Sequence, residues 1–156
     1  MSNLEKIPVT ILTGFLGAGK TTLIRNLIIK NKSKRLAVII NEFGDLGVDG
    51  EIVKQCSDET CPEENILELA NGCICCTVAD DFVPTMQKLI NGKYLPEHIL
   101  IETSGLALPK PLLKAFEWPE IRSKLTVDSV LAVVDAEAVI NGIFAPQMSG
   151  ETEKKQ

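Results

Sequence analysis

One stretch restricts the possible fold more than any other. Residues 14–21 read Gly-Phe-Leu-Gly-Ala-Gly-Lys-Thr, a complete G-x-x-x-x-G-K-[ST] motif. The apolar, β-branched run Ile7–Thr13 before it predicts a buried parallel strand. Residues 22–30 after it predict a helix, because four apolar side chains share one helical face: Leu23, Ile24, Leu27 and Ile28. Since the motif lies between a strand and a helix, it predicts a phosphate-binding loop rather than a chance match.

The chemistry of this loop predicts how a nucleotide would be held. Its glycines allow backbone N–H groups to surround the β- and γ-phosphates, and the helix N-terminus adds partial positive charge. Lys20 supplies a point charge to the same oxygens, and the Thr21 hydroxyl is a candidate ligand of Mg²⁺. We therefore expect nine consecutive residues to bind nucleotide: Gly14, Phe15, Leu16, Gly17, Ala18, Gly19, Lys20, Thr21 and Thr22.

Composition supports an α/β fold of the P-loop NTPase type, with a parallel sheet flanked by helices. The chain has 156 residues, 45% hydrophobic but only 4% aromatic, which suits one domain with an aliphatic core. A net charge of −5 argues against a nucleic-acid partner or an anionic membrane surface. No apolar run reaches the roughly 20 residues that span a bilayer, and the N-terminus lacks a signal-peptide pattern. We expect a cytoplasmic protein.

An acidic, glycine-rich loop follows the predicted buried strand Leu36–Ile40. Residues 41–50 contain three glycines and three acids, with Glu42 two positions after the strand. Ligands of open α/β sheets bind beyond the carboxyl ends of the strands, so this loop should lie beside the phosphate loop. Glu42 is a candidate to hold Mg²⁺ or orient a water molecule in a nucleotide-sensing switch. The alternative is a surface turn with solvated acids.

A second carboxylate ends the next long apolar strand. Residues 99–105 read Ile-Leu-Ile-Glu-Thr-Ser-Gly, so Glu102 occupies the tip of a strand expected beside the phosphate loop. That is the Walker-B position, where a carboxylate holds Mg²⁺ directly or through water. The N–H of Gly105 would approach the γ-phosphate. The alternative is a strand that merely ends in a polar turn. Lys20, Glu42 and Glu102 are thus the candidate catalytic residues.

Three of the five cysteines, Cys73, Cys75 and Cys76, form a C-x-C-C cluster. In a reducing compartment such clustering favours metal binding over disulfides. Three converging thiolates suit Zn²⁺, Co²⁺ or Cu⁺ and leave one position open for metal exchange. Three buried, inert thiols are the alternative. Cys56 and Cys61 lie in a polar stretch that predicts an exposed loop, and their C-x₄-C spacing is loose for a metal pair.

The remaining periodicity predicts shorter elements and one lone histidine. We expect strands over residues 66–69 and 127–134, helices over residues 80–90, 109–116 and Ala136–Ile140, and a short turn over residues 118–122. His98 precedes a strand and is expected to be a surface or packing residue rather than a ligand. Residues 1–145 are expected to form the domain, and residues 146–156 a polar, disordered tail.

Taken together, these motifs resemble the CobW family of P-loop GTPases over nearly the whole chain. The resemblance rests on residues 13–22, Asn41-Glu42-Phe43-Gly44, residues 71–76 and Glu102-Thr103-Ser104-Gly105. It implies a GTPase that binds a transition metal at Cys73, Cys75 and Cys76 and couples it to the nucleotide state. Residues 45–50, 77–82 and 102–109 look closer to the cobalamin-biosynthesis branch than to its zinc-related cousins. The resemblance therefore implies Co²⁺ delivery for cobalamin synthesis, with a cobalt-inserting chelatase as recipient.

The sequence also departs from this family. Such GTPases read guanine with an [NT]-K-x-D motif on a later strand, and the chain contains no such motif. The family's C-terminal domain is absent as well, so the chain looks like the N-terminal part of a member, cut before base recognition. The cofactors expected are GTP, Mg²⁺ and Co²⁺ or Zn²⁺. Two alternatives stay open: a zinc chaperone, and a fragment that binds nucleotide or metal without turnover.

Overall fold

The computed structural model describes residues 6–31, 33–40, 59–68, 82–103 and 109–142. These residues form five strands, a 3₁₀ turn and five helices. In chain order they are β1 (Ile7–Thr13), α1 (Lys20–Lys30), β2 (Leu36–Ile40), η1 (Glu63–Asn65), β3 (Ile66–Glu68), α4 (Val83–Ile90), β4 (His98–Glu102), α5 (Pro109–Ala115), α6 (Pro119–Arg122), β5 (Leu125–Ala132) and α7 (Ala136–Ile140). The predicted elements within the described ranges are all present, with ends shifted by a few residues.

The five strands make one parallel sheet in the order β3-β2-β4-β1-β5. Because every strand points the same way, their carboxyl ends lie along one edge. Leu12 on β1 and Ile40 on β2 both pair with Glu102 on β4, which fixes the register at that edge. Ligands of such sheets bind beyond this edge. The fold is the P-loop type that the phosphate-loop motif predicts.

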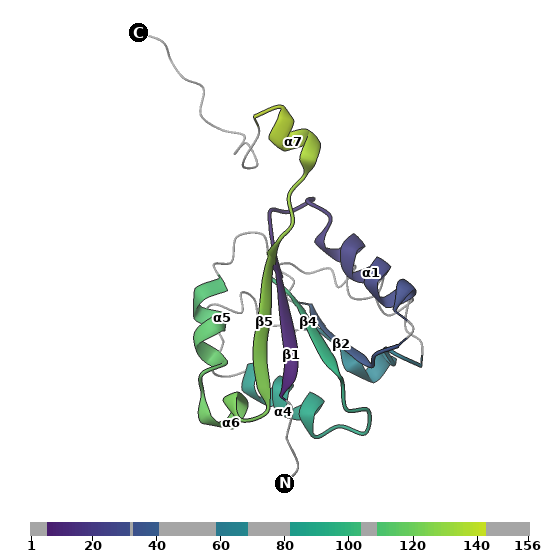
Figure 1. Cartoon of the computed structure of the whole chain (residues 1–156), viewed down its shortest axis with the longest axis vertical. Helices are drawn as coiled ribbons and strands as arrows, with labels where there is room; N and C mark the ends of the chain where they lie inside the picture. The colour runs from purple at the N-terminus through teal and green to yellow at the C-terminus, as the bar shows by residue number, and fades with distance from the viewer. Residues whose placement is uncertain (1–5, 32, 41–58, 69–81, 104–108, 143–156) are drawn as a thin grey trace.

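Helices cover both faces of the sheet, which explains why its central strands read as continuous apolar runs. Figure 1 shows α1 on one side and α5 on the other. Alternate strand residues face opposite ways, so β2 contributes Val38 to the α1 side and Ile39 to the α4–α5 side. On the second side, Phe82 and Phe116 meet edge to face with ring centroids 5.2 Å apart. Two hydrophobic cores, one on each face, therefore enclose the sheet.

Two details of packing differ from expectation. Of the four apolar residues predicted to share the buried face of α1, only Ile24 and Ile28 are fully buried, while Leu27 is well exposed. Cys61 is completely buried and packs in the apolar cluster on the α1 side of the sheet. The prediction of an exposed loop there is wrong at this residue, because the acids around it do not set the direction of its own side chain.

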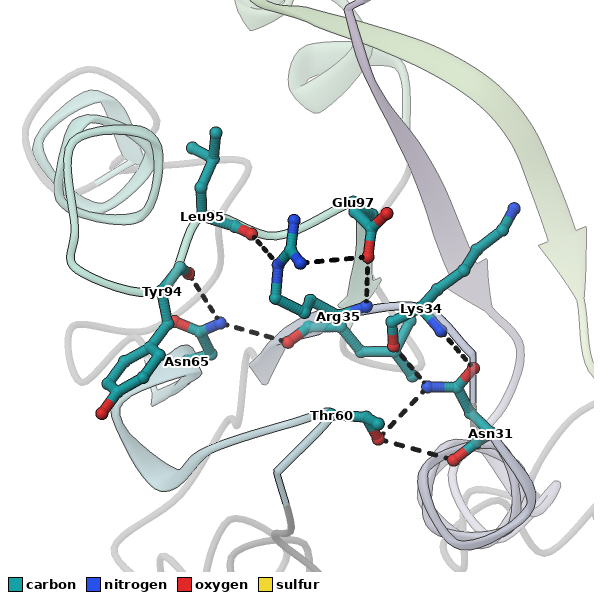
Figure 2. Close-up of polar contacts among 9 residues, drawn as sticks. Asn31, Lys34, Arg35, Thr60, Asn65, Tyr94, Leu95 and Glu97 are labelled. Carbon is teal, nitrogen blue, oxygen red and sulfur yellow. Dashed lines mark hydrogen bonds and ion pairs between the residues drawn. The ribbon is translucent and has the colours of Figure 1, made fainter.

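A polar network ties three segments together at the amino-terminal end of the sheet (Figure 2). The Asn65 amide, which is buried, donates to the carbonyls of Leu36 at 3.3 Å and Tyr94 at 3.0 Å. Arg35 donates from its backbone N–H to the Glu97 carboxylate at 2.9 Å and from Nε to the Leu95 carbonyl at 2.9 Å. These bonds hold the start of β2 and the approach to β3 against the loop before β4.

Helix length also bears on the membrane question. Among the helices of the described ranges, none is both long and apolar enough to cross a bilayer.

Candidate nucleotide site

The phosphate loop connects β1 to α1 at the carboxyl end of the sheet. The loop turns tightly, with the Ala18 N–H donating to the Phe15 carbonyl at 3.1 Å. Gly19 precedes α1 with φ +95°, a left-handed conformation that favours glycine. Since Gly19 has no side chain, no side-chain oxygen caps the first N–H groups of α1. An uncapped helix N-terminus offers its N–H groups and partial positive charge to an anion.

The Lys20 side chain curls back over this loop. Its ammonium donates to the carbonyl oxygens of Gly14 at 2.8 Å and Phe15 at 3.1 Å, and the residue is only 5% exposed. Lysine carries a compact charge with three donors on a flexible stem. The cation is thus held at the loop by backbone acceptors, from which it can also reach an anion bound by the same loop.

Thr21 and Glu102 come together from distant parts of the chain. The Thr21 hydroxyl donates to the Glu102 carboxylate, with Oγ1 3.0 Å from Oε1 and 3.2 Å from Oε2. Glu102 is only 6% exposed. A carboxylate in so buried a position is found where other groups pair with it or where it holds a cation. The contact joins the start of α1 to the tip of β4.

Strand alternation explains why Glu102 reaches α1. Leu100, two residues earlier, packs in the cluster on the α1 side, so Glu102 faces the same way. The next residue, Thr103, fixes the strand tip, because its N–H and its hydroxyl both donate to the Leu12 carbonyl, at 2.9 and 3.0 Å. Sequence reasoning assigned no role to Thr103. The one local signal is a threonine directly after an acidic strand end, and it does not identify the Leu12 carbonyl as the acceptor.

The end of β5 touches the phosphate loop, another contact that the sequence did not predict. A Cβ placed on Gly14 would lie 2.1 Å from the Val133 carbonyl oxygen, and Gly14 has φ +137°. The Val133 N–H donates to the Thr13 carbonyl at 2.8 Å. Gly14 is therefore required both for its backbone conformation and for close packing against this connection.

His98 takes part in a polar row that crosses three strands. The Thr10 hydroxyl lies 2.9 Å from His98 Nε2 and 3.0 Å from the Ser129 hydroxyl. Burial lowers the pKa of His98, and nearby Lys34 lowers it further, whereas Asp128 opposes the shift. The histidine thus has hydrogen-bonded packing at the end of the sheet away from the phosphate loop.

Several predicted site residues lie outside the described residues, namely Glu42, Cys73, Cys75, Cys76 and Gly105. The same holds for Cys56, for the predicted tail and for the glycine-rich loop over residues 41–50. Within the described ranges, no group of three or more His, Cys, Asp or Glu residues could hold a metal ion. Of the predicted site, the structure brings together the phosphate loop, Lys20, Thr21 and Glu102.

Comparison with known proteins identifies related chains. Curated relatives include two proteins named zinc chaperone CobW, from Sinorhizobium sp (63% identical) and Pseudomonas aeruginosa (58%), matching 92% and 93% of this chain. A Schizosaccharomyces pombe protein named zinc-regulated GTPase metalloprotein activator 1 is 40% identical over 90% of the chain, which covers 34% of that protein. The chain spans about two fifths of the length of the CobW relatives, 41% and 40%.

A solved structure and a family model agree with these relatives. The crystal structure of a Zn(II)-bound triple mutant of the YjiA GTPase matches with a TM-score of 0.59 and 28% identity. The match covers 88% of this chain and 43% of that one. The model of the CobW/HypB/UreG nucleotide-binding domain matches residues 8–156. The chain therefore belongs to the CobW/HypB/UreG family of nucleotide-binding domains.

Proposed function

We propose that this chain binds a Mg²⁺–nucleoside triphosphate, GTP by family, and uses the nucleotide state to take up and release a transition metal. The observation that carries the proposal is the convergence of Lys20, Thr21 and Glu102 beside an uncapped helix N-terminus. A cation, a hydroxyl and a carboxylate at one loop match the groups that bind a triphosphate and its Mg²⁺. Family membership supports the same reading.

The oxygens at this site suit Mg²⁺. The ion prefers six oxygen ligands at about 2.1 Å, so adjacent ligands lie about 3 Å apart. Thr21 Oγ1 lies 3.0 Å from Glu102 Oε1, a separation that would suit neighbouring positions around the ion. Glu102 would hold the ion directly or through a water molecule. When bound, the ion would neutralise charge between the phosphates. Lys20 would bind phosphate oxygens, and Glu42 would orient the attacking water.

The metal cargo is proposed to bind Cys73, Cys75 and Cys76. These residues follow β3, which ends at Glu68 beside β2, and β2 in turn pairs with β4 at Glu102. The last described residue before the cysteines, Glu68, therefore lies at the same edge of the sheet as Glu102. Loops ordered by the γ-phosphate and Mg²⁺ can assemble or disperse ligands. A reducing compartment such as the cytoplasm would keep the thiols available.

Zn²⁺ is the cargo that we favour, because two relatives are named zinc chaperones and a third is named a zinc-regulated GTPase metalloprotein activator. Co²⁺ for cobalamin synthesis, delivered to a chelatase, is the second candidate. It is supported by the resemblance of residues 45–50 and 77–82 to the cobalamin branch. Co²⁺ binds more weakly than Zn²⁺ at a given site, so selecting it would require metal availability or switched geometry.

Nucleotide binding is tested by titrating the full chain with Mg²⁺–GTP, with Mg²⁺–ATP as comparison. Glu102→Gln is expected to weaken the Mg²⁺-dependent part of GTP affinity by about 10-fold or more, since charged hydrogen-bond partners contribute about 1.5–3 kcal/mol. Binding without Mg²⁺ should change little. Glu97→Gln, at an exposed carboxylate on the opposite end of the sheet, is the matched control. Equal affinities for GTP in Glu102→Gln and the parent chain would refute the site.

Metal coupling is tested by measuring Zn²⁺ and Co²⁺ affinities with and without Mg²⁺–GTP. A Cys75→Ser variant should lose metal affinity while keeping nucleotide affinity. Cys61→Ser, at a buried thiol that is not part of the C-x-C-C motif, serves as control. Metal affinities that are the same in both nucleotide states would show a binding fragment without coupling. Single-turnover hydrolysis, compared with Lys20→Ala, decides whether the chain is a catalyst.

A further inference from the structure

A single backbone carbonyl near the end of β1 receives two hydrogen bonds from one residue. The Leu12 carbonyl oxygen accepts the Thr103 N–H at 2.9 Å and the Thr103 hydroxyl at 3.0 Å. The first bond continues the parallel ladder, since Leu12 pairs with Glu102 in the register of β1 and β4. The second bond is additional, because a ladder needs no side chain. Thr103 is only 1% exposed, so both donors are shielded from competing water.

The additional bond restrains the chain at the point where β4 ends. Glu102 is the last residue of β4, and the ends of an element open more easily than its middle. A threonine side chain is stiff at χ1, so a hydroxyl bonded to the Leu12 carbonyl fixes the Thr103 backbone as well. The peptide bond between Glu102 and Thr103 is then held in place. The direction in which the Glu102 side chain leaves the strand is held with it.

The carboxylate that this direction controls lies where Mg²⁺ is proposed to bind. Glu102 Oε1 is 3.0 Å from Thr21 Oγ1. A glutamate side chain has several rotatable bonds, so a small tilt of its backbone displaces the carboxylate oxygens by more than it displaces Cα. Mg²⁺ demands near-ideal octahedral geometry, and binding groups must be held within about 0.5 Å of their productive positions. A loose strand end would therefore weaken metal binding before it weakened the fold.

Together these contacts close a ring through the phosphate loop. Along the backbone, residues 12–21 run from the Leu12 carbonyl to the Thr21 hydroxyl. That hydroxyl donates to the Glu102 carboxylate, and the hydroxyl of the next residue, Thr103, donates back to the Leu12 carbonyl. The end of β4 is thus tied to both ends of the phosphate loop.

We propose that Thr103 is a positioning residue for Mg²⁺: its hydroxyl holds the Glu102 carboxylate at the metal position by tying the end of β4 to the start of the phosphate loop. This inference rests on the proposed function, because it needs Glu102 to hold the Mg²⁺ of a bound nucleotide. It adds a role in metal binding for a side chain that is bonded to the protein's own backbone. A hydroxyl that only stabilised the fold would leave the Mg²⁺ dependence of GTP binding unchanged.

The test measures the GTP affinity of the full chain with Mg²⁺ and with EDTA, and takes the ratio of the two, the Mg²⁺ ratio. Thr103→Val keeps the branched shape and the backbone N–H, so the Leu12 carbonyl still has a donor, but it removes the hydroxyl. The Mg²⁺ ratio should fall by about 5- to 10-fold, in the upper range of what one neutral hydrogen bond contributes. Affinity in EDTA should match that of the parent chain. Thr103→Ser keeps the hydroxyl and should restore the parent Mg²⁺ ratio.

Thr10→Val is the matched control. Thr10 is another buried threonine of the same sheet, but its hydroxyl lies 2.9 Å from His98 Nε2 and 3.0 Å from the Ser129 hydroxyl. Its loss should lower the urea midpoint at least as much as Thr103→Val does, because two side chains lose a partner. The Mg²⁺ ratio should equal that of the parent chain. An equal fall of the ratio in both variants would overturn the proposal, since any destabilised sheet would then weaken Mg²⁺ binding.

A double-mutant cycle shows whether Thr103 acts through Glu102. Glu102→Gln already lowers the Mg²⁺ ratio, so adding Thr103→Val should lower it no further. Two effects that multiply would contradict the proposal, because Thr103 would then act on its own. If Thr103→Val does not fold, Thr103→Ala replaces it in every comparison, since it also lacks the hydroxyl.

Failure of this inference can be told apart from failure of the proposed function. If Glu102→Gln lowers the Mg²⁺ ratio and Thr103→Val does not, Glu102 holds the ion without help from Thr103, and this inference alone is wrong. If the GTP affinity of the parent chain does not depend on Mg²⁺, or if Glu102→Gln matches the parent, both are wrong.

Discussion

The two ends of the sheet are both polar, but their polar side chains bond in different ways. At the amino-terminal end, Asn65 and Arg35 donate to backbone carbonyls of other segments, and Asn31 donates to the Thr60 hydroxyl, so these side chains tie separate parts of the chain together. At the carboxyl end, Thr21 donates to Glu102, and Lys20 donates to the carbonyls of its own loop. The polar side chains at the amino-terminal end stabilise the fold. Those at the carboxyl end lie together in one place, where they can bind a ligand with matching charges.

The largest effect on both stability and binding is expected at Gly14, because this residue belongs to the phosphate loop and also packs against the Val133 carbonyl. Gly14→Ala would place a Cβ 2.1 Å from the Val133 carbonyl oxygen and force a side chain onto a φ of +137°. Strain and overpacking together should lower the free energy of unfolding by about 2–4 kcal/mol. Chemical denaturation measures this loss, and GTP titration should show weakened binding in the folded fraction. Gly17→Ala is the control, because Gly17 also has a positive φ, +80°, but an added Cβ there meets nothing within 4 Å. It should therefore show backbone strain without overpacking, and a smaller loss in the free energy of unfolding.

Lys20→Ala addresses the carboxyl end alone. Losing a charge-assisted contact to the triphosphate should weaken GTP affinity by about 100-fold, at the upper end of what one charged hydrogen bond contributes. The free energy of unfolding should change by less than about 1 kcal/mol, because water can replace the ammonium at two carbonyls of a surface loop. Isothermal calorimetry and urea denaturation measure the two quantities. A large loss of stability with unchanged GTP affinity would show that Lys20 stabilises the fold and does not bind the nucleotide.

Asn65→Ala should give the opposite result. It removes the side-chain amide that donates to the carbonyls of Leu36 and Tyr94. The free energy of unfolding should therefore fall by about 2 kcal/mol. Nucleotide affinity of the folded protein should stay within about 2-fold. Asn31→Ala, in the exposed part of the same network, is the control and should cost less than half as much. Equal costs would mean that burial does not set the strength of this network.

The smallest expected effect is on pH dependence, through His98. Because burial lowers its pKa below the ordinary value of 6.5, the unfolded chain binds more protons than the folded chain as pH falls. This contribution to stability is fully present above about pH 6.5 and is lost as pH falls toward the lowered pKa of the folded protein. Urea midpoints from pH 8 to 5 should record the loss. His98→Gln should reduce the slope, and an unchanged slope would contradict the assignment.

Much of this architecture could be predicted from local patterns. Strand, glycine loop and helix follow from residues 7–30, because hydrophobic period and glycine placement are local properties. Glu102 could be placed at a strand tip for the same reason. Cys61 could not be placed correctly, since polar neighbours along the chain say little about which way one side chain turns. The roles of Thr103 and Val133 were also missed, because each depends on a carbonyl or glycine about 90 or more positions away.

By itself, then, the sequence determined the phosphate loop, the apolar strands, the acid at the end of β4 and the family. Each of these is written in consecutive residues. Only the tertiary structure decided that Thr21 and Glu102 are in contact and that Gly14 packs against the connection that follows β5. Those features depend on strand order and register, which arise from packing two apolar faces of the sheet at once and not from any single stretch of chain.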